Sequence, residues 1–298
     1  MTAPRRLLAS LLAVLALAAC SSTPSTASTS DVTLELDNRP FRVHVPPGYD
    51  PATKAPLLVL LHGYTSNATE IEDYFRVKDE ADRRGFLYAL PEGTENREKK
   101  RFWNATAACC DFFNSGVDDS RYLIGVVDTV AAKYSVDPAR VYFAGHSNGG
   151  FMALRMACDH ADRVTAVVSL AGAAAATPSL CTPDRAVSVL QIHGTADRTI
   201  LYDGGPESRP YPSAEETVAL WRRLDGCTDH ADKTPPPLDV DDYVAGAETT
   251  VTTYNDGCRD GARAELWSIK DGSHIPALTP AYATALADFL LARTAPTQ

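Results

Sequence analysis

The chain has 298 residues, of which 45% are hydrophobic and 22% charged, so it is long enough to bury a sizeable core in one large domain or two small ones. Its formal net charge is −10, from 38 acidic and 28 basic residues. No stripe of Lys and Arg is present to follow a phosphate backbone, so the composition argues against nucleic acid as a partner and favours a soluble acidic protein.

The start of the chain resembles an export signal. An Arg-Arg pair precedes an apolar run at 7–19, which is too short to span a bilayer as a stable helix. The run ends in LAAC, which resembles the lipobox of bacterial lipoproteins, so we expect 1–19 to be a lipoprotein signal peptide and Cys20 to be lipidated. The alternatives are an ordinary signal peptide with an incidental cysteine and, on a loose match, a twin-arginine signal.

The next segment, 20–30, is rich in Ser, Thr and Pro without an apolar pattern, which is typical of a flexible tether. Neither an internal repeat nor a second domain boundary follows, so 31–298 is predicted to form a single domain. We therefore expect an exported monomer on the outer face of the bacterial cytoplasmic membrane. Its only membrane contact would be the lipid anchor at Cys20.

The predicted elements alternate between strands and helices along the domain. A hairpin comes first, with strands at 32–36 and 41–45 joined by the turn residues DNRP. The other expected strands are 56–61, 86–90, 141–144, 164–170, 187–192, 249–254 and 264–269, and the expected helices are 67–84, 117–134, 148–160, 213–224 and 280–293. Between the expected strand 86–90 and the expected helix 117–134, residues 91–116 are predicted to form a long irregular loop. This order predicts an α/β-hydrolase fold, with a mostly parallel central sheet, helices on both faces and an N-terminal antiparallel hairpin.

Six cysteines follow the tether, and an even number in an oxidising compartment indicates three disulfides. Cys227 and Cys258 are the favoured pair, because both lie in the last third of the chain. A bond between the neighbours Cys109 and Cys110 is strained, so we expect each to reach one of the remaining two, Cys158 and Cys181, in either order. The absence of paired C-x-x-C spacing and of clustered histidines predicts no metal, and no cofactor is expected.

The motif with the clearest chemistry is GHSNG at 145–149, a G-x-S-x-G sequence. It follows the apolar segment VYFA and precedes a helical segment, which is the strand–turn–helix setting of a nucleophile elbow. Such a turn presents the hydroxyl of Ser147 at a helix N-terminus, where developing negative charge is favoured. We expect Ser147 to be a nucleophile, against the alternative of a structural glycine turn with an idle serine.

A serine hydroxyl is a weak nucleophile without a base, and in this architecture the acid and then the histidine follow the serine along the chain. Asp197 comes directly after the predicted strand SVLQIH and is the expected acid, with Asp203 as the fallback. His274 lies after the last strand and is the expected base, in preference to His230 in a polar loop. His146 is expected to pack rather than to act as a base.

Two backbone N–H groups are expected to form the oxyanion hole. One belongs to Asn148, the residue after the nucleophile, and the other to Tyr64 in the sequence HGY that follows a buried strand. Trp103, Ile200 and Ile275 are predicted to contact substrate, because their loops should converge on the serine. For Trp103, packing beneath the cysteine loop is an equal alternative.

These motifs occur together in the order LLHG, WN…CC, GVDD, VDPARVYFAGHSNGGFMA, IHGTAD, W…GC and GSHIP. This set resembles the secreted polyhydroxybutyrate depolymerase and feruloyl esterase group of the first carbohydrate esterase family, over about 32–291. The resemblance implies an α/β-hydrolase whose triad falls on Ser147, Asp197 and His274, acting on esters of hydroxyacids, ferulate or acetylated xylan. One departure is that Ile275 precedes Pro276 where relatives often carry Trp-Pro, which makes the wall beside the base aliphatic.

The predicted function is therefore a secreted serine carboxylic-ester hydrolase that works through an acyl-enzyme. Its expected substrates are feruloyl or acetyl esters of plant cell-wall polysaccharide, or hydroxyalkanoate esters. No appended substrate-binding domain is recognisable, which favours a soluble ester or hemicellulose side group over an insoluble polyester. Two alternatives are a serine peptidase of the same fold and a non-catalytic binding protein on a hydrolase scaffold.

Overall fold

The structure is a computed structural model that describes residue 1 and residues 30–296. Apart from residue 1, the predicted signal peptide 1–19, the lipidation site Cys20 and the tether up to residue 29 therefore lie outside the described residues. Within the described part, no helix is long and apolar enough to cross a membrane.

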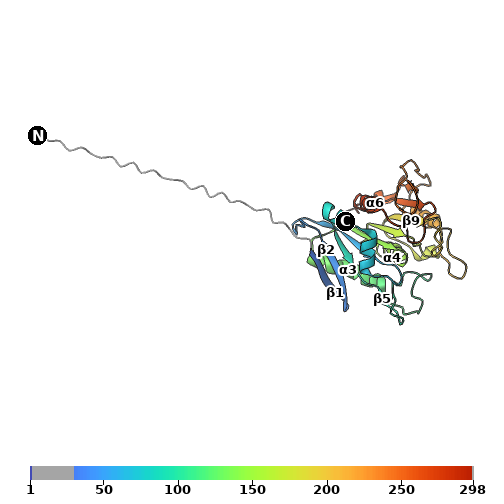
Figure 1. Cartoon of the computed structure of the whole chain (residues 1–298), viewed down its shortest axis with the longest axis horizontal. Coiled ribbons are helices and arrows are strands. Elements are labelled where there is room, and N and C mark those ends of the chain that lie inside the picture. Colours follow the sequence, from blue (N-terminus) through green and yellow to red (C-terminus); the bar gives the residue numbers. More distant parts are fainter. Residues whose placement is uncertain (2–29, 297–298) are drawn as a thin grey trace.

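A nine-stranded sheet forms the centre of the domain, in the order β1-β2-β4-β3-β7-β8-β9-β11-β10. Figure 1 shows the strands β1 and β2 on the left-hand side of the domain and β9 on the right. Its strands are β1 (Ser30–Leu36), β2 (Arg39–Val45), β3 (Ala55–Leu61), β4 (Leu87–Leu90), β7 (Val136–His146), β8 (Ala166–Leu170), β9 (Ser188–Gly194), β10 (Thr249–Tyr254) and β11 (Ala264–Ile269). The six central strands, β4, β3, β7, β8, β9 and β11 in sheet order, pair in parallel with one another. The strands β1 and β2 at one edge and β10 at the other pair antiparallel with their neighbours. The predicted fold class, including the N-terminal hairpin, is confirmed.

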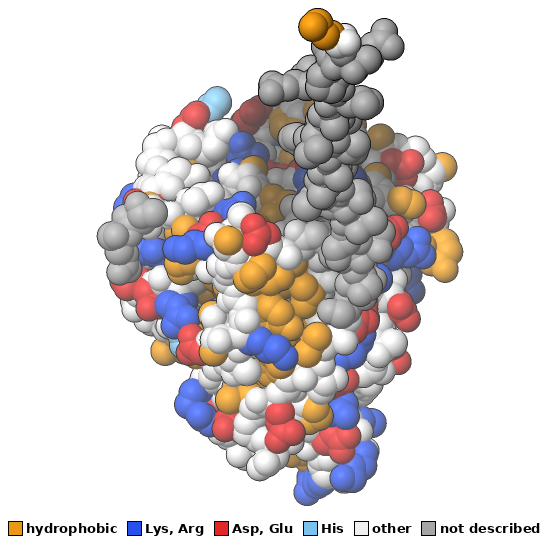
Figure 2. Space-filling view, turned by 90° about the vertical axis from the view of Figure 1, so that its left-hand side faces the viewer, with side chains coloured by type: hydrophobic (Ala, Val, Ile, Leu, Met, Phe, Trp, Pro, Cys, Tyr) orange, Lys and Arg blue, Asp and Glu red, His pale blue; other side chains and the backbone are white. Residues whose placement is uncertain are grey.

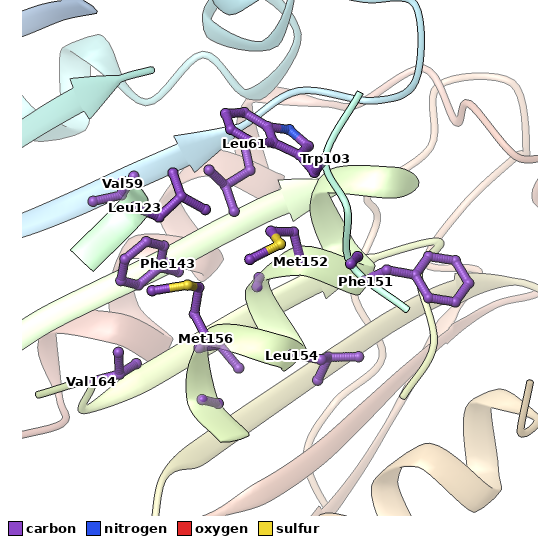
Figure 3. Packing of buried hydrophobic residues seen from close by; sticks show 14 of the residues in the cluster. Val59, Leu61, Trp103, Leu123, Phe143, Phe151, Met152, Leu154, Met156 and Val164 are labelled. Atoms are coloured by element: carbon purple, nitrogen blue, oxygen red, sulfur yellow. The ribbon is translucent and has the colours of Figure 1, made fainter. Parts of the chain in front are cut away.

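Helices cover both faces of the sheet. They are α1 (Ala68–Phe75), α2 (Lys78–Arg84), α3 (Asp119–Lys133), α4 (Asn148–Asp159), α5 (Ala214–Leu224) and α6 (Pro280–Leu291), with short 3₁₀ turns at Pro178–Leu180 and Arg259–Gly261. Strand β3 shows how one continuous apolar run serves two cores. Leu57, Val59 and Leu61 pack with α3 and α4, whereas Leu58 and Leu60 pack with α1 and α6. Figure 3 shows the first of these cores, where side chains of β3 lie among those of α4. Because successive side chains alternate across a strand, a strand buried on both faces is apolar throughout.

The helix expected at 67–84 is two helices, α1 and α2. Arg76 closes α1 in the left-handed conformation, with φ 52° and ψ 34°, and its N–H bonds the carbonyl of Glu72. A right-handed helix cannot continue through a residue in this conformation, and buried residues lie on both sides of the break, Ile71 and Phe75 on α1 and Ala81 on α2. The irregular loop 91–116 also contains a small hairpin, β5 (Thr94–Glu95) with β6 (Arg101–Phe102).

Three disulfides are present among the described residues, and one part of the predicted pairing is wrong. Cys227 is bonded to Cys258, the favoured pair. Cys158 at the end of α4 is bonded to Cys181, with their Cα atoms 5.2 Å apart, so neither of them is available to the cysteine loop. Cys109 and Cys110 are instead bonded to each other. Both are buried against the core, so the bond closes a tight turn within the loop rather than linking it to another element.

Strong reductant is expected to lower the melting temperature. The Cys227–Cys258 bond alone spans a sequence separation of 31 residues, and closing such a loop is worth about 3–4 kcal/mol in the chain-entropy model. For a domain of this size, that corresponds to a decrease of about 10 °C. Calorimetry with and without reductant tests this. The Cys227→Ser/Cys258→Ser variant should start lower and lose less on reduction, and an unchanged melting temperature would contradict a structural role.

The surface carries charges of both signs in mixture. Figure 2 shows one face on which acidic and basic side chains are interspersed around a central group of hydrophobic side chains. Neighbouring opposite charges, such as Arg163 with Asp128 at 2.6 Å, pair on the surface.

Candidate active site

Ser147 lies in a sharp turn between β7 and α4. Its backbone has φ 54° and ψ −118°, a conformation that residues with a side chain rarely adopt. Glycine is required on both sides of the turn. A Cβ on Gly145 would lie 2.3 Å from the carbonyl carbon of Gly149, and one on Gly149 would lie 2.1 Å from the carbonyl oxygen of Leu61. The G-x-S-x-G sequence therefore forms an elbow that presses directly on the end of β3.

The structure brings the three residues expected for a triad together. Asp197 follows β9, and His274 follows β11, which is the parallel neighbour of β9 in the sheet. The His274 Nε2 atom lies 2.9 Å from Ser147 Oγ, and its Nδ1 atom lies 2.7 Å from Asp197 Oδ2. Since the carboxylate is an acceptor, Nδ1 carries the hydrogen and Nε2 is free to accept the hydroxyl proton. The other histidine considered, His230, is 74% exposed in its side chain and pairs with Asp256.

Asp197 is held as an anion. Burial raises the pKa of its carboxyl group, but hydrogen bonds from His193 and His274 and the charge of His274 outweigh this effect, so the pKa lies well below its ordinary value. The Oδ1 atom also accepts hydrogen bonds from the backbone N–H groups of Thr199 and Ile200, at 2.7 and 3.0 Å. Asp197 is thus both ionised and fixed in orientation.

His146 packs behind this arrangement, as expected. Its Nε2 atom lies 2.9 Å from the carbonyl oxygen of His274 and donates to it, and its ring is 5.0 Å from the His274 ring. Burial, followed by the nearby charge of His274, lowers the pKa of His146 to about 4. A neutral His146 therefore steadies the backbone of the His274 loop without adding positive charge near the serine.

The two expected oxyanion donors come from opposite sides of Ser147. Asn148 is the first residue of α4, and Tyr64 lies in the loop after β3. Within the described part of the chain, neither backbone N–H is paired with a protein acceptor. The loop is close to the serine, because a Cβ on Gly63 would lie 3.6 Å from the Ser147 Cβ.

A cleft of about 450 Å³ opens over Ser147 and His274. Ile275 lines it and is 59% exposed, in agreement with its predicted position. Sequence reasoning missed the side chains that α1 and its approach contribute to this cleft. They are Ser66, Glu70, Ile71 and Tyr74, joined by Thr199 from the loop after β9. The signal was available, since this helix follows the HGY loop directly.

The predictions that Trp103 and Ile200 contact substrate are wrong. Trp103 is fully buried, and its indole Nε1 donates to the carbonyl oxygen of His62 at 3.0 Å. Ile200 is 3% exposed and packs in the core, while its backbone serves Asp197 and His193. Their side chains point into the core, because hydrogen bonds from the Trp103 indole to His62 and from the Ile200 N–H to Asp197 hold them against the protein.

The fold and the serine elbow define a hydrolase of the α/β class. Residues 40–234 match the family described as Esterase PHB depolymerase, and the chain belongs to this family. It is a carboxylic ester hydrolase, in agreement with the names of its relatives.

Two curated relatives show the range of the likeness. The chain is 29% identical over 242 residues to a putative esterase, NocK, of Nocardia uniformis subsp. tsuyamanensis, covering 77% of this chain and 69% of that protein. It is 26% identical over 241 residues to feruloyl esterase B of Piromyces equi, covering 78% of this chain and 42% of the relative. Among solved structures, an acetyl xylan esterase from Aspergillus awamori has the same fold, with a TM-score of 0.63 at 16% identity, covering 88% of this chain and 99% of that one.

Proposed function

We propose that this protein is a secreted serine carboxylic-ester hydrolase that uses Ser147, His274 and Asp197 through an acyl-enzyme. The observation that carries the proposal is the position of His274 between the other two, within hydrogen-bond distance of both. A hydroxyl, a neutral imidazole and a carboxylate in this order are the groups that serine acyl transfer needs.

The proposed reaction has two halves. His274 Nε2 takes the proton of Ser147 while Oγ attacks the ester carbonyl, and the resulting oxyanion accepts hydrogen bonds from the N–H groups of Tyr64 and Asn148. His274 then gives the proton to the departing alcohol, which leaves an acyl group on Ser147. Water, activated by the same imidazole, releases the acid and restores the serine. Asp197 stabilises the imidazolium in both halves without taking its proton.

The acyl group is proposed to be aromatic, of the feruloyl type, with acetyl and hydroxyalkanoyl esters as the other candidates. The cleft supports this choice, because Tyr64 and Tyr74 line it together with Ile71 and Ile275, so a planar ring meets apolar walls. Among the relatives, names include feruloyl esterase, acetylxylan esterase and poly(3-hydroxyalkanoate) depolymerase.

A substrate panel tests this proposal. We expect the highest kcat/KM on methyl ferulate, a lower value on acetylated xylan and the lowest on hydroxybutyrate oligomers, measured as released acid. Ser147→Ala protein provides the blank for each substrate. A preference for hydroxybutyrate oligomers would reject the feruloyl assignment while leaving the serine mechanism in place, and cleavage of peptide amides above esters would favour the peptidase alternative.

Export and lipid anchoring belong to the same proposal. Three disulfides in the described part of the chain favour an oxidising compartment. Lipidation of Cys20, placement on the outer face of the bacterial cytoplasmic membrane and a monomeric state stay predictions from the sequence.

A further inference from the structure

Trp103 does not line the cleft, yet it bonds to both sides of the proposed oxyanion hole. The residue is fully buried between the end of β3 and the start of α4. Figure 3 shows its indole in the buried cluster that includes Leu61 of β3 and Met152 of α4. All three polar groups of Trp103, namely the backbone N–H, the backbone carbonyl and the indole N–H, are hydrogen-bonded.

On one side, the backbone of Trp103 binds the side-chain amide of Asn148. The Trp103 N–H donates to Asn148 Oδ1 at 2.7 Å, and Asn148 Nδ2 donates to the Trp103 carbonyl oxygen at 2.9 Å. Two bonds in opposite directions fix both the position and the rotation of the amide. Since the backbone N–H of Asn148 is one proposed oxyanion donor, this pair also restrains the peptide that carries it.

On the other side, the indole N–H of Trp103 donates to the carbonyl oxygen of His62, at the end of β3. The Tyr64 N–H lies in the same planar peptide unit as the Gly63 carbonyl, so a restraint on that carbonyl fixes where the N–H points. The His62 ring supplies this restraint, because Nδ1 donates to the Gly63 carbonyl oxygen at 2.8 Å and Nε2 accepts the Gly93 N–H at 2.9 Å. Trp103 thus holds the backbone of the residue whose ring orients the Tyr64 peptide.

The turn closed by Cys109 and Cys110 supports Trp103 in this position. The Cys110 N–H donates to the Trp103 carbonyl oxygen at 3.2 Å, and the Ala105 N–H donates to the Cys109 carbonyl oxygen at 3.1 Å. On the preceding side, the Arg101 carbonyl oxygen accepts the Thr65 N–H at 2.8 Å. The segment from β6 to Cys110 is therefore tied at several points to both the β3 loop and the elbow.

We propose that Trp103 is a positioning residue that sets the distance between the two oxyanion donors, the N–H groups of Tyr64 and Asn148. This inference rests on the proposed function. A transition-state oxyanion needs both donors at hydrogen-bond distance at once, whereas a ground-state carbonyl is less demanding. Loosening the link should therefore weaken transition-state binding more than substrate binding.

The test is Trp103→Phe, which keeps an aromatic ring and both backbone bonds to Asn148 but removes the indole N–H. Removing a whole oxyanion donor lowers kcat by about 10²–10³-fold, so displacing one donor should lower kcat by roughly 10-fold. KM should change less than twofold, and inhibition by a boronic acid, whose tetrahedral adduct on Ser147 imitates the oxyanion, should weaken about as much as kcat falls. The pH profile should not move, because His274 and Asp197 are untouched.

Trp267→Phe is the matched control. Trp267 is also buried and also loses an indole hydrogen bond on this change, at 2.6 Å to Glu265 Oε1, but it lies within β11. Its kcat per active site should stay within twofold of the wild type. Equal losses in the two variants, or a raised KM with unchanged kcat in Trp103→Phe, would overturn the inference.

Asn148→Ala tests the same link from the elbow side and serves if Trp103→Phe does not fold. It removes both side-chain bonds to Trp103 and keeps the backbone N–H, so we again expect a fall in kcat and weaker boronic acid binding without a matching rise in KM. Wild-type kinetics in this variant would reject the inference. Ser147→Ala in the same series distinguishes failure of the proposed function from failure of the positioning role. If Ser147→Ala stays active, the proposed function is refuted. If Ser147→Ala is inactive while the Trp103 and Asn148 variants keep wild-type kinetics, only the positioning role is refuted.

Discussion

Replacing Ser147 by alanine is expected to lower kcat on p-nitrophenyl acetate by a factor of about 10⁶, the scale at which loss of the nucleophile acts in a serine hydrolase. The change removes one oxygen atom that has a single side-chain partner, His274. The elbow should persist, because its geometry depends on Gly145 and Gly149 and on the Ser147 N–H, which donates to the Leu170 carbonyl oxygen at 2.7 Å. Folding and stability are therefore expected to stay close to those of the wild type.

Initial rates and a melting curve on the same preparation check this prediction. Ser179→Ala, in an exposed 3₁₀ turn, is the matched control and should retain full activity. Full activity in Ser147→Ala would refute the triad assignment. An inactive wild type would instead favour the alternative of a binding protein on a hydrolase scaffold.

The order of elements and the three converging side chains were predictable because each has a local signal. Strand β3 is apolar at every position since both faces are covered, and the elbow is marked by two glycines that have no room for a side chain. Asp197 and His274 follow strands that turn out to be neighbours in the sheet, and in a parallel sheet all strand ends of one kind meet at one edge. The order of the three residues along the chain and their positions after parallel strands were therefore enough to predict the site from the sequence.

The features that sequence reasoning missed depend on contacts between distant segments. Trp103 lies in a segment that the sequence predicts to be an irregular loop, yet its indole N–H donates to the carbonyl oxygen of His62, 41 positions earlier. Cys158 and Cys181 are bonded to each other, which leaves Cys109 and Cys110 as partners, and no local sequence pattern indicates this pairing. Helix α1 ends at Arg76 in the left-handed conformation, a place usually taken by Gly or Asn, so the sequence carries no helix-ending signal there.

A buried acid away from the site gives the second large effect. Asp225 at the end of α5 is fully buried; its Oδ1 atom accepts the Val187 N–H at 3.0 Å, and its Oδ2 atom has no protein partner among the described residues. Burial raises the pKa of this carboxyl group to about 7, against smaller opposing effects of the Val187 hydrogen bond and the charge of Arg259. The folded protein therefore holds a proton here that the unfolded chain releases near pH 4.

Stability should consequently fall as the pH rises. Because the folded-state pKa is raised, the contribution of Asp225 is fully present below about pH 4, declines up to about pH 7 and is constant above it, a total of about 4 kcal/mol over three pH units. Asp225→Asn keeps the acceptor for Val187 and carries no charge, so it resembles the protonated acid. We expect it to match the wild type in free energy of unfolding near pH 4 and to exceed it by about 3–4 kcal/mol at pH 8.

Urea unfolding of both proteins at several pH values between 4 and 8 measures this difference. Asp162→Asn is the matched control, since Asp162 is exposed and its replacement should change the free energy of unfolding by no more than about 0.5 kcal/mol. A difference for Asp225→Asn that stays constant from pH 4 to 8 would show that the carboxyl group titrates as in the unfolded chain. A variant less stable than the wild type at pH 8 would show that the ionised carboxylate is stabilised in place, with the charge of Arg259 outweighing burial.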